Sequence, residues 1–198
     1  MGTAVLRERA YRRVPWKNGG GTTREVAAGP SAGGDGFDWR VSVADVAAEG
    51  PFSAFPGVDR VITLVEGEGM VLTVDGAEHR LAPLAPYAFP GEAATDCRLP
   101  GGAARDLNLM TRRGRAAGSV RVTDVAGALD LECAAGAVLL VLPVAGSLSL
   151  DDGGGRAEPL ARLDCVRHDG AGSVRLRGHG GVAEIRVTPA PGHREHRH

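Results

Sequence analysis

The sequence predicts an all-β protein made of two similar β-barrel or jelly-roll modules that lie side by side. From residue 38 onward, short apolar runs are broken by Gly, Pro and Asp, and little repeats at helical spacing. The 198 residues include 30 Gly and 12 Pro, which is typical of a fold with many turns. The second half of the chain also repeats the apolar pattern of the first half.

Three strands are predicted from local patterns. In residues 38–45, Trp39, Val41 and Val43 fall on one face, and polar side chains fall on the other. Residues 61–66 and 70–74 are two further apolar runs. Asp75-Gly76 follows the second run, and this pair is typical of a type I′ hairpin turn.

The internal repeat has an offset of about 77 residues, an estimate that follows from sliding the chain on itself. Residues 61–76 lie over residues 138–153, and the run from Leu81 to Leu84 lies over that from Leu160 to Leu163. The order of strands and turns resembles the first half of a cupin barrel, so the duplication implies a bicupin. We expect residues 1–115 to form the first barrel with an N-terminal motif segment, residues 116–190 a second, degenerate barrel, and residues 191–198 a disordered tail.

The composition of the chain argues against nucleic acid and membranes as partners. The formal net charge is -1, so no electrostatic bias toward nucleic acid or membranes exists. No apolar segment is long enough for a membrane span, and the N-terminus lacks the pattern of a signal peptide, so we expect a cytoplasmic protein. The three cysteines have no metal-binding spacing and are predicted to be reduced.

Residues 14–25 contain more kinds of side chain suited to ligand binding than any other segment of this length in the chain. Trp16, Lys17 and Asn18 precede three consecutive glycines, and Glu25 closes the segment. The glycines allow close approach of a ligand to the backbone. A phosphate loop is disfavoured because the Lys precedes the glycines instead of following them. The alternative is a flexible turn without a binding role.

Two predicted strands add polar side chains. In residues 105–113, Asp106 and Asn108 share a face, while Arg40 and Ser42 project from the polar face of residues 38–45. Each polar face lies either toward the barrel lumen or toward solvent, and Arg40 could instead pair with a carboxylate for structural reasons. Phe55 lies in the Pro- and Gly-rich segment 50–60, where it could cover a ligand.

The sequence lacks the residues expected of a cupin metal site or of a catalytic site. Cupin metal sites use a His-x-His pair and a carboxylate on the first hairpin, but His79 is the only histidine in residues 61–91. We therefore predict no metal, no cofactor and no assigned catalytic residue. The missing histidines favour a non-enzymatic role. Whether the protein is an enzyme stays open, because Glu25 or Asp106 could still act as a general base.

Residues 15–25, 39–46, 50–60 and 106–112 together resemble the HutD/Ves family in both order and spacing. This resemblance implies a bicupin fold, a cytoplasmic bacterial protein and an association with histidine utilisation. It implies an accessory or regulatory factor that senses an intermediate such as urocanate or a formylated or formiminated glutamate. Leu107 stands where the family often has Phe, which we expect to alter the volume of the pocket.

The leading hypothesis is a metal-free bicupin that binds a small carboxylate metabolite in its first barrel. The predicted ligand-binding residues are Trp16, Lys17, Asn18, Glu25, Arg40, Ser42, Phe55, Asp106 and Asn108. The cations would neutralise the carboxylate, and Glu25 could orient Lys17 or Arg40 without touching the ligand. The alternatives are a metal-independent cupin enzyme of epimerase or hydrolase type and a protein-interaction module, and the chain could form a homodimer.

Overall fold

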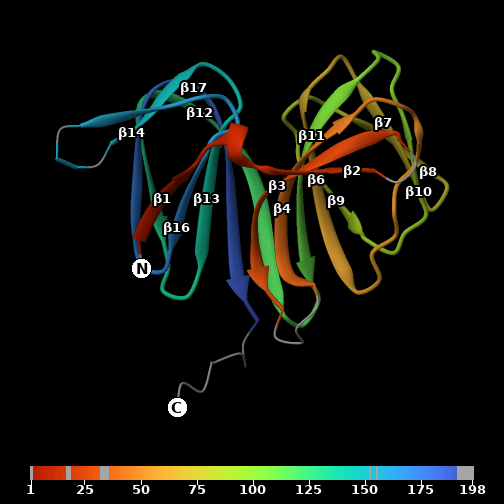
Figure 1. The fold of residues 1–198 in the computed structure, drawn as a ribbon, viewed down its shortest axis with the longest axis horizontal. Coiled ribbons are helices and arrows are strands. Elements are labelled where there is room, and N and C mark those ends of the chain that lie inside the picture. Colours follow the sequence, from red (N-terminus) through yellow and green to blue (C-terminus); the bar gives the residue numbers. More distant parts are fainter. Residues whose placement is uncertain (1, 17–18, 32–35, 152, 155, 191–198) are drawn as a thin grey trace.

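The protein consists of two β-barrels side by side, as predicted for a bicupin (Figure 1). The structure, a computed structural model, describes residues 2–16, 19–31, 36–151, 153–154 and 156–190. The expected tail, residues 191–198, therefore lies outside the described residues, as do Lys17 and Asn18. No helix in the described ranges is long and apolar enough to cross a membrane.

The first barrel is built from two sheets that face each other across a lumen. One sheet has the strand order β2-β3-β4-β11-β6-β9, and the other has the order β5-β10-β7-β8. Their bounds are β2 Arg12–Pro15, β3 Gly21–Pro30, β4 Phe37–Val46, β5 Gly50–Pro51, β6 Val58–Glu66, β7 Met70–Val74, β8 Ala77–Leu81, β9 Tyr87–Pro90, β10 Thr95–Arg98 and β11 Ala104–Arg112.

The second barrel is one curled sheet with the order β1-β16-β13-β17-β14-β15, and β12 also pairs with β17. Its strands are β1 Gly2–Leu6, β12 Ala116–Cys133, β13 Val138–Pro143, β14 Ser147–Asp151, β15 Ala157–Leu160, β16 Cys165–Asp169 and β17 Gly172–Pro189. β17 pairs with β14 through its first half and with β13 through its second half, so it spans both sides of the barrel.

The predicted internal repeat is confirmed by equivalent elements. Strands β6 to β9 of the first barrel correspond in order to β13 to β16 of the second. Leu84 and Leu163, matched by the repeat, both have positive φ, at 62° and 65°, which is uncommon for any residue except glycine. Their backbone N–H groups donate equivalent hydrogen bonds, to Leu64 O at 2.9 Å and to Pro143 O at 2.8 Å. The two barrels therefore share local backbone geometry as well as apolar pattern.

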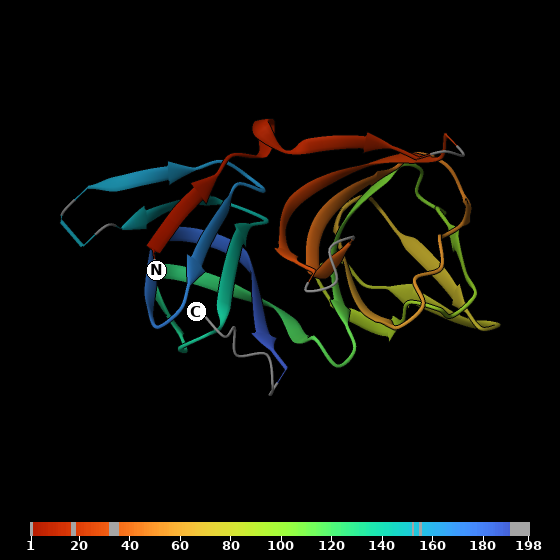
Figure 2. The same ribbon diagram turned by 60° about the horizontal axis from the view of Figure 1, so that its bottom comes forward.

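The N-terminal segment joins the two barrels (Figure 2). β1 pairs antiparallel with β16 of the second barrel, and the chain then crosses through a single 3-10 turn, Glu8–Ala10, to β2 of the first barrel. The expected division of the chain between residues 115 and 116 falls between β11 and β12, but it does not describe β1, which completes the sheet of the second barrel. This pairing is long-range, so local sequence pattern carried no signal for it.

An apolar layer fills the space between the barrels. Trp39, Val41, Leu107 and Leu109 of the first barrel belong to one buried cluster with Ile185 and its neighbours in the second. Sheet packed on sheet in this way buries a continuous core. Around the layer, Arg162 of the second barrel donates hydrogen bonds to Glu66 Oε2 at 2.7 Å and to Val65 O.

Strand β11 shows how this layer shapes the first barrel. Its residues alternate as predicted, but neither face meets solvent, because Leu107 and Leu109 face the second barrel while Asp106 and Asn108 face the lumen. The expectation that Leu107 alters the pocket volume is therefore wrong, since its side chain packs between the barrels and not in the lumen.

The interiors of the two barrels differ. The interior of the second is packed by an apolar cluster drawn from its strands, with members such as Leu131, Leu139, Val166 and Leu176. In the first barrel a comparable cluster, which includes Leu72, fills only part of the lumen. The remainder is a cavity lined by polar and aromatic side chains.

Replacing Leu107 with Ala tests the role of the apolar layer. Leu107 is fully buried, so its truncation should lower the free energy of unfolding by about 2–5 kcal/mol. Urea denaturation followed by tryptophan fluorescence and circular dichroism measures this change. Leu129→Ala, at a partly exposed position of β12, is the matched control, and an equal effect of the two substitutions would contradict the proposed importance of the layer.

Candidate functional site

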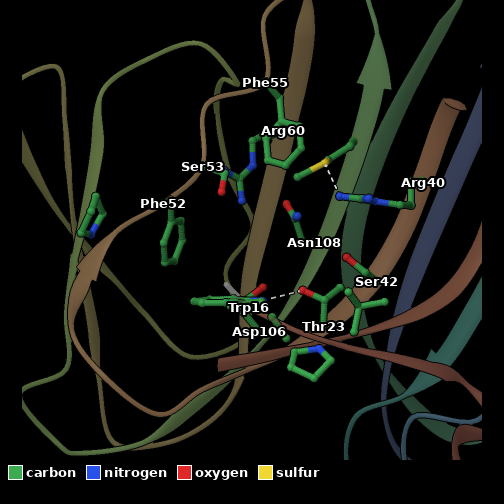
Figure 3. Close-up of a pocket in the computed structure, with 15 residues that line it drawn as sticks. Trp16, Thr23, Arg40, Ser42, Phe52, Ser53, Phe55, Arg60, Asp106 and Asn108 are labelled. Carbon is green, nitrogen blue, oxygen red and sulfur yellow. Dashed lines mark hydrogen bonds between the residues drawn. The ribbon is translucent and has the colours of Figure 1, made fainter. Parts of the chain in front are cut away.

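The first barrel contains a cavity of about 390 Å³ (Figure 3). Strands β3, β4, β6 and β11 form its wall, and the turn between β2 and β3 and the segment between β5 and β6 border it. The lining residues are Val14, Pro15, Trp16, Thr23, Arg40, Ser42, Ala44, Pro51, Phe52, Ser53, Phe55, Arg60, Asp106, Asn108 and Met110. A cavity of this size is sufficient for a small metabolite.

Trp16 is held at the edge of the cavity by the N-terminal hairpin. Its backbone N–H donates to Gly21 O at 2.9 Å, and its indole Nε1 donates to Thr23 Oγ1 at 2.8 Å. A Cβ at position 21 would lie 2.4 Å from Asp45 O and 3.1 Å from the Trp16 ring, so glycine is required there. The predicted glycine-rich segment is thus a tight hairpin turn that fixes an aromatic ring beside the cavity.

Arg40 enters the cavity from β4. Its Nη2 donates to Met110 Sδ at 3.2 Å, and its guanidinium lies over the rings of Phe37 and Phe55, at 4.7 and 5.7 Å from their centroids. Its buried Nε has no hydrogen-bond partner within the described structure. Burial lowers the pKa of Arg40, while the nearby charge of Glu25 raises it. Arg40 therefore remains a cation that no carboxylate in the described ranges neutralises through an ion pair.

Arg60 lines the cavity from β6 and was not among the predicted site residues. It is 6 % exposed, and its guanidinium lies 5.5, 5.6 and 4.9 Å from the ring centroids of Phe52, Phe55 and Phe89. Burial lowers its pKa to about 10, so it stays charged at neutral pH. Its buried Nε also lacks a partner among the residues described. The signal was present in the sequence, because Arg60 continues the inward-facing row of Ile62 and Leu64 on β6.

Asp106 and Asn108 project into the cavity from β11. Asp106 is 2 % exposed, and burial raises its pKa to about 7, with the charge of Arg60 acting in the opposite direction. Asn108 is 5 % exposed, and its Oδ1 has no hydrogen-bond partner in the part of the chain that is described. Buried polar atoms are normally satisfied, so Asn108 Oδ1 and the Nε atoms of Arg40 and Arg60 make this cavity the candidate site.

The segment between β5 and β6 places two aromatic rings against the cavity. Phe52 contacts Trp16 edge to face, with ring centroids 6.0 Å apart. Phe55 lies within reach of both Arg40 and Arg60, as given above, and Figure 3 shows both guanidinium groups directed toward the same cavity. Planar rings and cations in one cavity are suited to a small planar anion.

The structure brings together six of the nine predicted site residues. Those that line the cavity are Trp16, Arg40, Ser42, Phe55, Asp106 and Asn108. Glu25 does not line it, and its carboxylate lies 3.8 Å from Arg12 Nη2 on the neighbouring strand. Lys17 and Asn18 lie outside the described residues. The lining residues absent from the predicted set are Val14, Pro15, Thr23, Ala44, Pro51, Phe52, Ser53, Arg60 and Met110.

Other reactive groups lie away from the cavity lining. The three cysteines are free and buried, and burial raises the pKa of both Cys97 and Cys165 to about 12, so their thiols are protonated. Within the described ranges, no group of three or more His, Cys, Asp and Glu residues is placed to hold a metal ion. The chemistry of the cavity is that of two cations, one buried carboxyl group and one amide.

The buried carboxyl group predicts a specific pH dependence of stability. Asp106 holds its proton up to about pH 7 in the folded protein, whereas an unfolded Asp ionises near 3.8. The folded state therefore binds more protons across this window, so its stability falls as pH rises from about 4 to about 7, by up to roughly 4 kcal/mol for this group. Asp106→Asn should remove that part of the dependence.

Urea denaturation of the wild type and Asp106→Asn at pH 5 and pH 8 measures the effect. The free energy of unfolding of the variant should clearly exceed that of the wild type at pH 8. At pH 5 the difference between the two should be much smaller. A stability difference that is the same at the two pH values would show that Asp106 ionises normally.

Comparison with known proteins places this geometry in a family. The HutD family model matches residues 8–184. An uncharacterised 21.2 kDa protein from the hutC 3′ region of Pseudomonas putida is 40% identical over 167 residues, covering 84% of this chain and 86% of that protein. Protein Ves from Citrobacter koseri is 46% identical over 118 residues, covering 57% of this chain and 61% of its own.

A solved structure supports the same assignment. The structure of HutD from Pseudomonas fluorescens SBW25 has a TM-score of 0.83 and 38% sequence identity to this chain, with 95% of this chain and 99% of that one covered. The predicted resemblance is therefore confirmed in both sequence and fold. The chain belongs to the HutD family.

Proposed function

We propose that the first barrel binds a small carboxylate-bearing metabolite, and that the protein acts through this binding as an accessory or regulatory factor in histidine utilisation. The observation that carries the proposal is the pair of guanidinium groups, Arg40 and Arg60, which face one cavity without an ion-pair partner in the described structure. Placing two such cations in a largely desolvated site is costly unless an anion compensates for them. A carboxylate matches the planar fork of a guanidinium.

The other lining residues support a planar or partly apolar ligand. Trp16, Phe52 and Phe55 offer ring surfaces, and Ser42 and Asn108 offer hydrogen-bonding groups on the strand walls. Urocanate and formylated or formiminated glutamate combine a carboxylate with a planar group, so they fit this chemistry. Family membership supports the link to histidine breakdown, because one relative is named for its position near hutC in Pseudomonas putida.

The wider setting of the proposal follows from the composition of the chain. Free, buried cysteines and a net charge of -1 are consistent with action in the cytoplasm on a small molecule instead of on nucleic acid or a membrane. A homodimer is compatible with this role, and size-exclusion chromatography with light scattering would determine the assembly.

Thermal denaturation with candidate metabolites tests the proposal. Histidine, urocanate, formiminoglutamate, formylglutamate and glutamate would each be added, with EDTA and divalent metal ions in parallel. A ligand at a hundredfold excess over its Kd stabilises the native state by about 2.7 kcal/mol, which corresponds to a rise in Tm of roughly 5–10 °C for a chain of this length. The absence of a shift with every carboxylate would contradict the proposal.

Charge-removing variants locate the binding site. Arg60→Gln and Arg40→Gln should each weaken carboxylate binding about 10- to 100-fold, because hydrogen bonds to charged groups contribute about 1.5–3 kcal/mol. Arg12→Gln is the matched control, since Arg12 has a largely exposed side chain on β2 and does not line the cavity. Isothermal titration calorimetry of variants with cooperative melts measures the affinities. Equal losses in all three variants would contradict binding at the cavity arginines.

A metal-independent enzyme is the second candidate, and Asp106 is the observation that favours it. A buried carboxyl group with a pKa of about 7 beside two cations is suited to general acid-base chemistry at neutral pH. Mass spectrometry of each stabilising metabolite after incubation with the protein distinguishes the two candidates. Turnover that Asp106→Asn abolishes would favour the enzyme, whereas binding without turnover favours the sensor.

A further inference from the structure

Asp106 is the one acidic residue among the described residues that line the cavity. Its backbone pairs with β4 and β6, but its carboxyl group makes no side-chain hydrogen bond or ion pair with another residue in the described ranges. A carboxylate with a structural role is expected to be paired at such depth. The equivalent strand position in the second barrel holds a carboxylate that is paired.

Glu184 is the counterpart of Asp106 in the second barrel. Asp106 lies opposite Leu64 of β6, and Glu184 lies opposite Val141, which the repeat matches to Leu64. Glu184 is equally buried, at 3 % exposure, but it forms ion pairs with Arg121 at 3.0 Å and with Arg186 at 2.5 Å. The same position thus carries a paired carboxylate in one barrel and an unpaired one in the other.

The charged groups that act on Asp106 come from the two strands that pair with β11. Arg60 on β6 is the nearby cation that favours its ionised form, and Asp45 on β4 is the nearby anion that disfavours it. Asp45 is itself held by Arg24 and Arg105, through hydrogen bonds of 2.6–3.0 Å. Burial, and to a smaller extent the charge of Asp106, raise the pKa of Cys97 on β10 to about 12, so its thiol is protonated. Burial has the largest effect on the ionisation of Asp106, and among the neighbouring charges Arg60 has the largest effect.

We infer that Asp106 takes up a proton from solvent when a carboxylate binds at Arg60, so that the cavity binds an anion and a proton together. This inference rests on the proposed function. A bound carboxylate cancels the field of Arg60 at Asp106 and adds a second negative charge to a desolvated site. A second carboxylate nearby disfavours the ionised form of Asp106 and so raises its pKa further.

Proton uptake by Asp106 sets the charges of the cavity before and after a carboxylate binds. It moves from solvent to the Asp106 carboxylate, and no covalent bond of the ligand is made or broken. The empty cavity has two cations and, when Asp106 is ionised, one anion; the occupied cavity has two cations, one bound carboxylate and a neutral Asp106. The O–H of the protonated Asp106 carboxyl group can then donate a hydrogen bond to a ligand oxygen.

Proton uptake makes the affinity depend on pH. Burial raises the pKa of Asp106 to about 7 before any ligand enters, so the empty site is poised between its two protonation states at neutral pH. Above that pH the proton must be taken up on binding, and affinity for a carboxylate should fall up to about tenfold for each pH unit. Below it Asp106 is already protonated, and affinity should be nearly constant.

Nuclear magnetic resonance with sodium formate tests this inference. Formate is the smallest carboxylate and remains ionised from pH 5 to pH 9. The Asp106 carboxyl carbon would be followed against pH in 13C-labelled protein, with sodium formate or an equal concentration of sodium chloride, and assigned with Asp106→Asn. The titration midpoint of the Asp106 carboxyl group, read from the chemical shift of its carbon, should be at least one pH unit higher in formate than in chloride.

Two variants sharpen the test. Formate affinity of Asp106→Asn should be independent of pH between 6 and 9, because its amide cannot take up the proton. Asp96→Asn removes an exposed carboxylate of the same barrel and should keep the pH dependence of the wild type.

The outcomes separate the inference from the proposed function. Formate that shifts the resonances of Arg60 and Asn108 without raising the midpoint of Asp106 would overturn proton uptake and leave carboxylate binding intact. Formate that fails to perturb Arg60 at any concentration up to the solubility of the salt would overturn carboxylate binding, and proton uptake with it.

Discussion

The apolar layer between the two barrels is the interaction on which the site depends. It covers the outer face of strands β4 and β11, which in an isolated barrel would meet water. Both faces of these strands are therefore removed from solvent, one by the second barrel and one by the lumen. Arg40, Asp106 and Asn108 project from this doubly covered wall. The low polarizability of their surroundings strengthens electrostatic interactions in the cavity and raises the cost of leaving a charge unpaired.

Duplication explains how one protein can contain a packed barrel and an open one. The repeat preserves strand order and the unusual backbone of Leu84 and Leu163, so both barrels have the same frame. The second barrel fills its interior with apolar side chains and pairs Glu184 with two arginines. Its contribution is thus structural, through the apolar layer and the strand β1 that it receives from the N-terminus. The first barrel keeps its space and its unpaired polar groups.

Much of the fold could be predicted because alternation and turn chemistry are local. The Asp75-Gly76 turn has positive φ at both residues, at 46° and 84°, as a type I′ turn requires. The pairing of β1 with β16 could not be predicted, since it joins residues 159 to 167 positions apart, from Leu6 with Cys165 to Gly2 with Asp169, and no local pattern encodes it.

The candidate site was predicted in part, for related reasons. Alternation placed Asp106 and Asn108 on one face but could not say whether that face met solvent or the lumen. Arg60 was missed because it directly precedes the predicted apolar run 61–66, although β6 begins earlier, at Val58, and a charge at the end of a strand is usually solvated. Glu25 shares the face of Ser42 across the sheet, yet its carboxylate lies near Arg12. Side-chain direction of this kind depends on neighbouring charges, not on strand pattern.

A crystal structure of the protein grown with saturating formate would test the central claim most directly. The account predicts a carboxylate in the first barrel whose oxygens lie about 2.7–2.9 Å from guanidinium nitrogens of Arg60 or Arg40. Formate bound only at surface arginines, with water alone beside Arg40 and Arg60, would contradict it.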